Sequence, residues 1–191
     1  MGHAEYFLGL MAIVSGLAVT DMVASVHGLL RRFKRVRWHF LPVAAAAVVF
    51  LSILYGWFVS WRSDWSNLPF WMFVIGILQL VALFLAAKAV LPDDDGRETE
   101  VDLLAHYWLY NRYVWLALTA MNILLIVPLL PNSGDASFAE LFSLARSWLF
   151  YIGLTLSLIL FQNSWWHRIL VPVMLGIIVT LWGGQTLTGT L

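Results

Sequence analysis

Residues 6–30 (YFLGLMAIVSGLAVTDMVASVHGLL) run directly into residues 31–37 (RRFKRVR), and the junction between them decides the fold class. The first stretch has one formally charged residue, Asp21, and about 20 apolar residues are enough for an α-helix to cross the hydrocarbon core of a bilayer. The basic stretch that follows cannot enter that core, so it marks a boundary between membrane and water. The pattern predicts a transmembrane helix that ends in a basic loop.

The rest of the chain repeats this pattern and contains no segment long enough for a soluble domain. The sequence therefore predicts an all-α, polytopic membrane protein of six transmembrane helices. The predicted spans are residues 6–30, 38–61, 69–91, 105–130, 138–161 and 165–182. Composition agrees, because 61% of the residues are hydrophobic and only 12% are charged, about half the charged fraction of a soluble domain.

The orientation of the helices follows from Lys and Arg, which gather in the first, third and fifth loops. Short loops rich in these residues stay on the cytoplasmic side of a membrane. We therefore expect the loop 31–37 in the cytoplasm and both termini outside, in a bacterial-type cytoplasmic (inner) membrane. The basic residues of the first loop also predict contact with anionic lipid. They are Arg31, Arg32, Lys34, Arg35 and Arg37.

Tryptophans lie near the ends of the predicted spans, as expected for belts at the two membrane–water interfaces. The outer belt is predicted to contain Trp57, Trp61, Trp65, Trp71 and Trp148, and the inner belt Trp38, Trp108, Trp165 and Trp166. The third loop is acidic and lies on the same side as the basic first loop, so the two are expected to meet.

Ionisable residues inside a span are costly, and each is a candidate for function. Asp21 in the first span and Arg112 in the fourth fall at similar predicted depth from the cytoplasmic face. They are predicted to form a structural ion pair or to line an ion or proton path, with Asn111 beside them; in a third alternative Arg112 extends to the interface. His27 and His106 are expected at the cytoplasmic mouth of that path.

Two further patterns concern the arrangement of the helices. Residues 17–22 (LAVTDM) resemble residues 116–121 (LALTAM), which suggests two inverted three-helix repeats, an arrangement common in transporters. Small residues recur at helical spacing in the first span and predict that this helix lies at the bundle centre or at an oligomer interface. They are Gly9, Ala12, Gly16, Thr20 and Ala24.

Several functions are disfavoured by what the sequence lacks. The net charge of zero provides no basic field for nucleic acid, and the absence of cysteine removes thiolate metal sites. Enzyme activity is the least favoured class, because no nucleophile and base converge in a known motif. Haem or a metal at His27 and His106 is not favoured, since no two of the histidines near the cytoplasmic ends share one helical face. These histidines are His27, His39, His106 and His167.

The function predicted from sequence is movement of an ion or small solute across the inner membrane, with the charged residues of the first and fourth helices in or near the path. The alternative is a non-transporting accessory or scaffold subunit of a larger membrane complex. A homo-oligomer is expected for a transport protein of this size, because six helices leave little room for a polar path within one chain.

Overall fold

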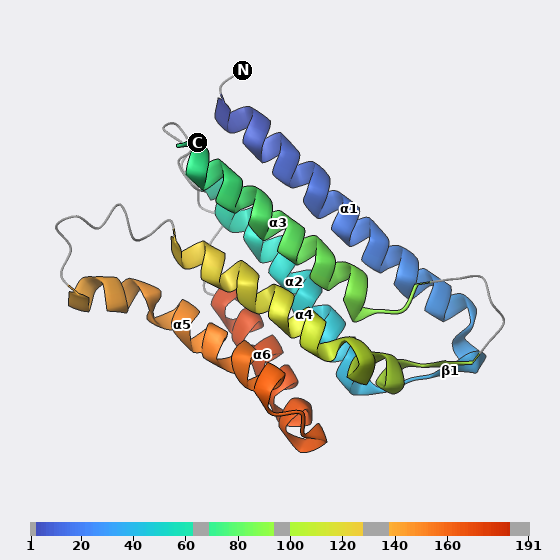
Figure 1. Cartoon of the computed structure of the whole chain (residues 1–191). Helices are drawn as coiled ribbons and strands as arrows, with labels where there is room; N and C mark the ends of the chain where they lie inside the picture. Colours follow the sequence, from blue (N-terminus) through green and yellow to red (C-terminus); the bar gives the residue numbers. More distant parts are fainter. Residues whose placement is uncertain (1–2, 63–68, 94–99, 128–137, 184–191) are drawn as a thin grey trace.

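The computed structural model describes residues 3–62, 69–93, 100–127 and 138–183, which form six α-helices and two short strands (Figure 1). The helices are α1 (His3–Arg31), α2 (Phe40–Arg62), α3 (Phe70–Val90), α4 (Leu103–Ile126), α5 (Phe138–Leu160) and α6 (Ser164–Gly183). The all-α class is confirmed, and the helix ends lie close to the predicted ones. The predicted end of the fourth span, residue 130, lies outside the described residues.

Four helices are long and apolar enough to cross a membrane, and they are α1 to α4. In α5 and α6 the apolar segments are shorter in the part whose side chains are described, Arg146–Leu160 and Ser164–Thr180. A helix satisfies all its backbone hydrogen bonds internally, which is the condition for lying in lipid. The chain is therefore compatible with a membrane protein containing transmembrane helices.

Local sequence signals explain where two of the helices begin and end. The Asp102 carboxylate accepts a hydrogen bond from the Ala105 backbone N–H at 2.9 Å and caps α4, so this helix begins at Leu103. Pro69 directly precedes α3, and Pro92 follows its end. Proline has no backbone N–H to donate. At either of these places it limits the helix without removing a hydrogen bond from the helix interior.

The arrangement of the helices corrects one of the two alternatives predicted for α1, because this helix lies at the edge of the bundle and not at its centre (Figure 1). The other alternative, an oligomer interface, stays a prediction. Helix α3 lies between α1 and α4, and its interface with α4 is the most extensive one. The small residues of α1, from Gly9 to Ala24, are all exposed. The close approach of α1 and α3 depends instead on Gly76 of α3, where any side chain would collide with the Phe7 ring.

The two halves of the chain pack differently. Helices α1, α2 and α3 contact one another pairwise, whereas α6 packs mainly against α2 and α5 mainly against α4. The helices α2, α4, α5 and α6 thereby form a closed ring of neighbours. This difference gives no support to the predicted inverted repeat.

The two strands join the loops that precede α2 and α4. Strand β1 (Val36–Arg37) pairs in parallel with β2 (Val101–Asp102), and Arg37 Nη2 lies 3.3 Å from Glu100 Oε2. Both of these side chains are largely exposed, and such ion pairs contribute little, so the backbone pairing is the main connection. The predicted meeting of the basic and acidic loops is confirmed here. We call this side of the bundle the basic end.

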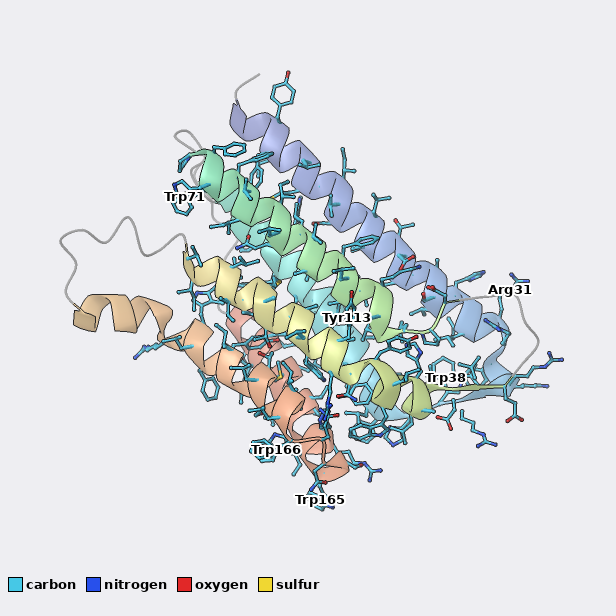
Figure 2. The ribbon with its side chains drawn as sticks, viewed as in Figure 1. Arg31, Trp38, Trp71, Tyr113, Trp165 and Trp166 are labelled. Carbon is cyan, nitrogen blue, oxygen red and sulfur yellow. The ribbon has the colours of Figure 1, made fainter. Side chains whose placement is uncertain are left out.

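The labelled tryptophans lie at two levels of the bundle (Figure 2). Trp71 lies at one end, and Trp38, Trp165 and Trp166 lie at the basic end, all of them exposed. This placement agrees with the two predicted aromatic belts. The side chains of Trp61 and Trp65 lie outside the described residues.

Candidate functional site

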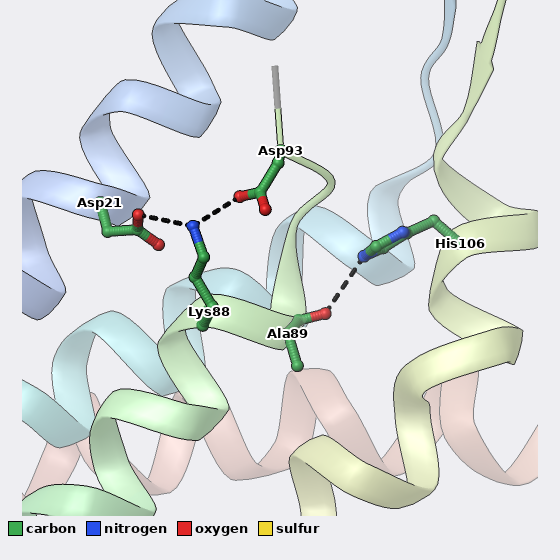
Figure 3. Close-up of polar contacts among 5 residues, drawn as sticks. All are labelled: Asp21, Lys88, Ala89, Asp93 and His106. Carbon is green, nitrogen blue, oxygen red and sulfur yellow. Dashed lines mark hydrogen bonds and ion pairs between the residues drawn. The ribbon is translucent and has the colours of Figure 1, made fainter. Parts of the chain in front are cut away.

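Three charged residues, from α1, α3 and the segment that follows α3, form a cluster at the surface of the basic end. Lys88 Nζ lies 2.9 Å from Asp21 Oδ1 and 2.9 Å from Asp93 Oδ1, so the ammonium group lies between two carboxylates (Figure 3). We call Asp21, Lys88 and Asp93 the rim cluster. The side chains of Asp21, Lys88 and Asp93 are 27%, 44% and 58% exposed.

Asp21 lies close to the end of α3, although it is far from the end of its own helix, α1. Helix α1 has 29 residues and α3 has 21, and α1 extends beyond α3 at the basic end. Asp21 therefore lies beside the last turn of α3, where Lys88 stands two residues before the helix end. The position of Asp21 relative to the end of α3 depends on the lengths of both helices, so the sequence of one span does not reveal it.

The predicted Asp21–Arg112 pair is not formed, because α3 lies between the helices that carry the two residues. Asp21 pairs with Lys88 instead. Arg112 is exposed on α4, and within the described part of the chain it has no ion-pair partner. Its exposed position is compatible with the third alternative from sequence, in which the guanidinium group extends to the interface, and this alternative stays a prediction.

The predicted cytoplasmic mouth is not built from His27 and His106 together. His27 is exposed on α1. His106 Nε2 lies 3.1 Å from the Ala89 carbonyl oxygen, and the imidazole ring packs on Tyr110 with ring centroids 4.7 Å apart. His106, Lys88 and Asp93 line an open groove between α3 and α4. Helix α3, and not α1, is therefore the partner of His106.

Asn111 is the one predicted site residue that lies in the bundle interior. It is almost completely buried, and its Nδ2 donates to the Trp108 carbonyl at 2.9 Å. Its Oδ1 has no hydrogen-bond partner among the described residues. A buried acceptor without a partner is uncommon and is a natural position for an ordered water.

Asn111 belongs to a line of buried polar side chains along one face of α4, which we call the α4 polar row. Its members recur every three or four residues, so they share a face about 120° wide and span about 22 Å along the helix axis. They are Tyr107, Asn111, Trp115, Thr119 and Asn122, all buried. This length covers most of a hydrocarbon core of about 30 Å.

At the basic end, the α4 polar row is bound to α6 by three side chains, which we call the His167 triad. Trp115 Nε1 donates to the Tyr107 hydroxyl at 3.1 Å, and that hydroxyl lies 2.6 Å from His167 Nδ1. His167 Nε2 lies 3.1 Å from the Phe161 carbonyl oxygen, which can only accept. The imidazole therefore carries its proton on Nε2, and Tyr107 donates to Nδ1.

The middle and far end of the α4 polar row connect to α5 and to a cavity. The hydroxyl oxygens of Thr119 and Thr155 lie 2.8 Å apart. The Thr155 hydroxyl donates to the Ile152 carbonyl, and the single Thr119 proton is within reach of both the Thr155 oxygen and the Trp115 carbonyl. Asn122 Nδ2 donates to the Leu118 carbonyl at 2.6 Å, and Asn122 lines a cavity between α2, α4, α5 and α6. The row thus leads from the basic end to this cavity.

The interior of the bundle is polar but uncharged. Among the side chains that the structure describes, none of the buried ones belongs to Asp, Glu, Lys or Arg. Sequence reasoning followed the charges and missed His167, Tyr107, Thr119 and Thr155 as interior groups. The spacing of 107, 111, 115 and 119 was a usable signal, because it marks one face of a helix, but nothing in the sequence indicates that His167 meets Tyr107.

The histidines near the basic end each form hydrogen bonds with a different part of the bundle. His39 Nδ1 accepts from the Leu41 backbone N–H at 3.2 Å at the start of α2, while His106 bonds to α3 and His167 to α4. Within the described ranges, no group of three His, Cys, Asp or Glu side chains lies close enough together to hold a metal ion.

Comparison with known proteins adds no assignment. No protein-family model matches this chain, and no curated protein or solved structure matches it at a significant level.

Proposed function

We propose that the protein moves protons across a bacterial-type inner membrane along the α4 polar row. The observation that carries this proposal is the row itself, a line of buried, uncharged polar groups that leads from the His167 triad to the cavity. Polar groups in a membrane interior are costly and mark ion or proton paths. The movement of an ion predicted from sequence is kept, and its path is moved from Asp21 and Arg112 to the interior.

The chemistry of the row favours the proton over other ions. A metal cation needs several oxygen ligands around it, and an inorganic anion is usually held by cationic side chains. The row and His167 together offer hydroxyl, imidazole and amide groups, none of which holds a fixed charge in the observed arrangement. The free Oδ1 of Asn111 supports a water site beside this residue.

His167 is the proposed entry group. In the observed arrangement its Nδ1 accepts from the Tyr107 hydroxyl. This hydrogen bond occupies the lone pair of Nδ1, so the nitrogen cannot take an incoming proton. When the Tyr107 hydroxyl turns away, Nδ1 takes the proton, and Nε2–H keeps its bond to the Phe161 carbonyl. Nδ1 then gives this proton to the Tyr107 oxygen while the Tyr107 hydroxyl passes its own proton to a water beside Asn111, which leaves both the imidazole and the phenol neutral again. The Trp115 indole N–H donates to the Tyr107 hydroxyl oxygen and so favours the arrangement in which this hydroxyl donates to His167 Nδ1.

Proton flux into liposomes tests the proposal. The purified full chain is reconstituted into vesicles that contain the pH-sensitive dye pyranine, and the external pH is lowered with valinomycin and potassium present to balance charge. We expect faster acidification than in protein-free vesicles. His167→Gln keeps a donor and an acceptor for Phe161 and Tyr107 but does not titrate, so we expect at least a tenfold loss of flux with the folded yield retained.

Two matched controls lie outside the row. Arg112→Gln and Tyr113→Phe alter exposed side chains of the same helix and should leave the flux unchanged. Flux at the level of protein-free vesicles, or full flux in His167→Gln, would contradict the proposal. An inactive chain that co-purifies at fixed stoichiometry with a larger membrane complex would instead favour the accessory or scaffold subunit.

The proposal includes the expected orientation and assembly. The basic end, with the loop 31–37 against anionic lipid, faces the cytoplasm, and His167 then accepts protons from that side. A homo-oligomer is part of the proposal, and its stoichiometry in nanodiscs is measurable by mass photometry.

A further inference from the structure

A cavity of about 450 Å³ lies within the ring formed by α2, α4, α5 and α6. Each of these four helices contributes side chains to its wall. Its volume falls in the range of cavities that bind drug-sized molecules, about 300 to 1,000 Å³. The α4 polar row reaches it at Asn122, but the proposed proton path does not account for a space of this size.

The wall of the cavity is apolar and aromatic, with a few neutral polar groups. The rings of Tyr55 and Trp148 face each other from α2 and α5 with centroids 5.9 Å apart. Ser52 and Asn122 supply a hydroxyl and an amide, and none of the described residues of the wall is charged. A site of this chemistry suits a neutral, amphipathic ligand and disfavours an ion.

Tyr151 provides the polar contact that remains unused. The residue is 8% exposed, lines the cavity, and its hydroxyl has no hydrogen-bond partner within the described residues. Ser52 lies close to it, and because the Ser52 hydroxyl donates its proton to the Val48 carbonyl at 2.8 Å, Ser52 can only accept from Tyr151; the two hydroxyls do not form a hydrogen bond of good geometry. A buried hydroxyl without a partner costs about 1 to 3 kcal/mol, and a ligand that accepts its hydrogen bond removes this cost.

We infer that the cavity binds a neutral ring compound with a carbonyl group, for which the ring of a quinone is the model. The ring lies against Tyr55 and Trp148, and the carbonyl oxygen accepts from the Tyr151 hydroxyl. Such a ligand partitions into the bilayer and reaches the bundle from the membrane. The inference goes beyond the proposed proton movement, because equilibrium binding does not require flux.

Binding of menadione (2-methyl-1,4-naphthoquinone) to the full chain in nanodiscs tests the inference, with empty nanodiscs as the background. We expect saturable binding at one site per chain. Tyr151→Phe removes only the hydroxyl and should weaken binding about tenfold. Tyr113→Phe makes the same change on an exposed face of α4 and should leave the affinity unchanged. 2-Methylnaphthalene, which lacks the carbonyls, should bind about tenfold more weakly than menadione.

A second variant fills the cavity without disturbing the fold. Gly56 lines the cavity, and a Cβ atom there meets no other atom within 4 Å, so Gly56→Leu should abolish menadione binding while the helix is retained. Gly153→Leu is the matched control, because Gly153 is exposed on α5 and has the same free space.

The outcomes separate this inference from the proton proposal. Equal menadione binding in the native chain, Tyr151→Phe and Gly56→Leu would overturn the inference, as would equal binding of 2-methylnaphthalene or a lack of saturation. Site-specific binding without proton flux would support the cavity and contradict the proton path. Flux without specific binding would do the reverse.

Discussion

The two faces of α4 carry polar groups of different kinds. The outward face carries Arg112 and His106, and beside it the rim cluster holds Lys88 between two carboxylates at the surface. The inward face carries only uncharged groups, and all of them are buried. Groups with a fixed charge therefore lie at the surface, and groups that are neutral in the observed arrangement fill the interior.

The energetic reason is the different cost of burial. An unpaired charge in a low-dielectric interior costs far more than a neutral polar group that has a hydrogen-bond partner. Charged residues in the spans attract attention in a sequence, yet here they are placed at the edge. The neutral polar residues, less conspicuous in sequence, are the ones that connect α4 to α5 and α6. Substitutions in the interior should therefore destabilise the protein more than substitutions at the edge.

Replacement of His167 should have the largest effect on stability. His167→Ala leaves the Tyr107 hydroxyl without its acceptor and the Phe161 carbonyl without its donor, and it also opens a space in the core. We expect a loss of about 3 kcal/mol in the free energy of unfolding, measured by denaturant titration in detergent micelles. A loss below about 1 kcal/mol would show that the triad does not hold α4 and α6 together.

Loss of the hydroxyl contact between α4 and α5 should have an intermediate effect. Thr119→Val keeps the shape of the side chain and removes its bond to Thr155, which retains its own bond to the Ile152 carbonyl. The expected destabilisation is about 1 kcal/mol in the same titration. Thr20→Val on the exposed face of α1 is the control, since its hydroxyl bonds only to the Gly16 carbonyl among the described contacts.

Changes in the rim cluster should cost less. Asp21→Asn leaves Lys88 paired with Asp93, so we expect less than about 1 kcal/mol. Lys88→Met should cost more than Asp21→Asn, because two carboxylates then lie close together without a cation. The difference between the two variants should shrink as salt is added to the titration, and a difference independent of salt would contradict a surface electrostatic origin.

The smallest effect is expected for Arg112 and for its coupling to Asp21. Arg112→Gln should change stability by less than about 0.5 kcal/mol. The double variant Asp21→Asn, Arg112→Gln should equal the sum of the single variants within about 0.3 kcal/mol, because the two residues share no contact. A larger coupling energy in this double-mutant cycle would restore the ion pair expected from sequence.

The positions of the helices could be predicted from the amino-acid sequence. Runs of about 20 apolar residues and the charges, prolines and cap residues between them are local signals, and they located α1 to α4 and the approximate ends of α5 and α6. The sequence also singled out Asn111 and the meeting of the first and third loops. Loop position alone was enough for that meeting, since alternate loops lie on the same side of a bundle.

Which helices are neighbours could not be predicted from the sequence and became clear from the folded bundle. The apolar surfaces of these helices are chemically alike, so periodicity does not tell α1 whether it packs against α3 or α4, and Asp21 was assigned the wrong partner. The contact of His167 with Tyr107 joins residues 60 positions apart, and the cavity is formed by four helices together. Such features depend on how side-chain shapes fit between helices, and this fit is a property of the folded bundle and not of any one segment.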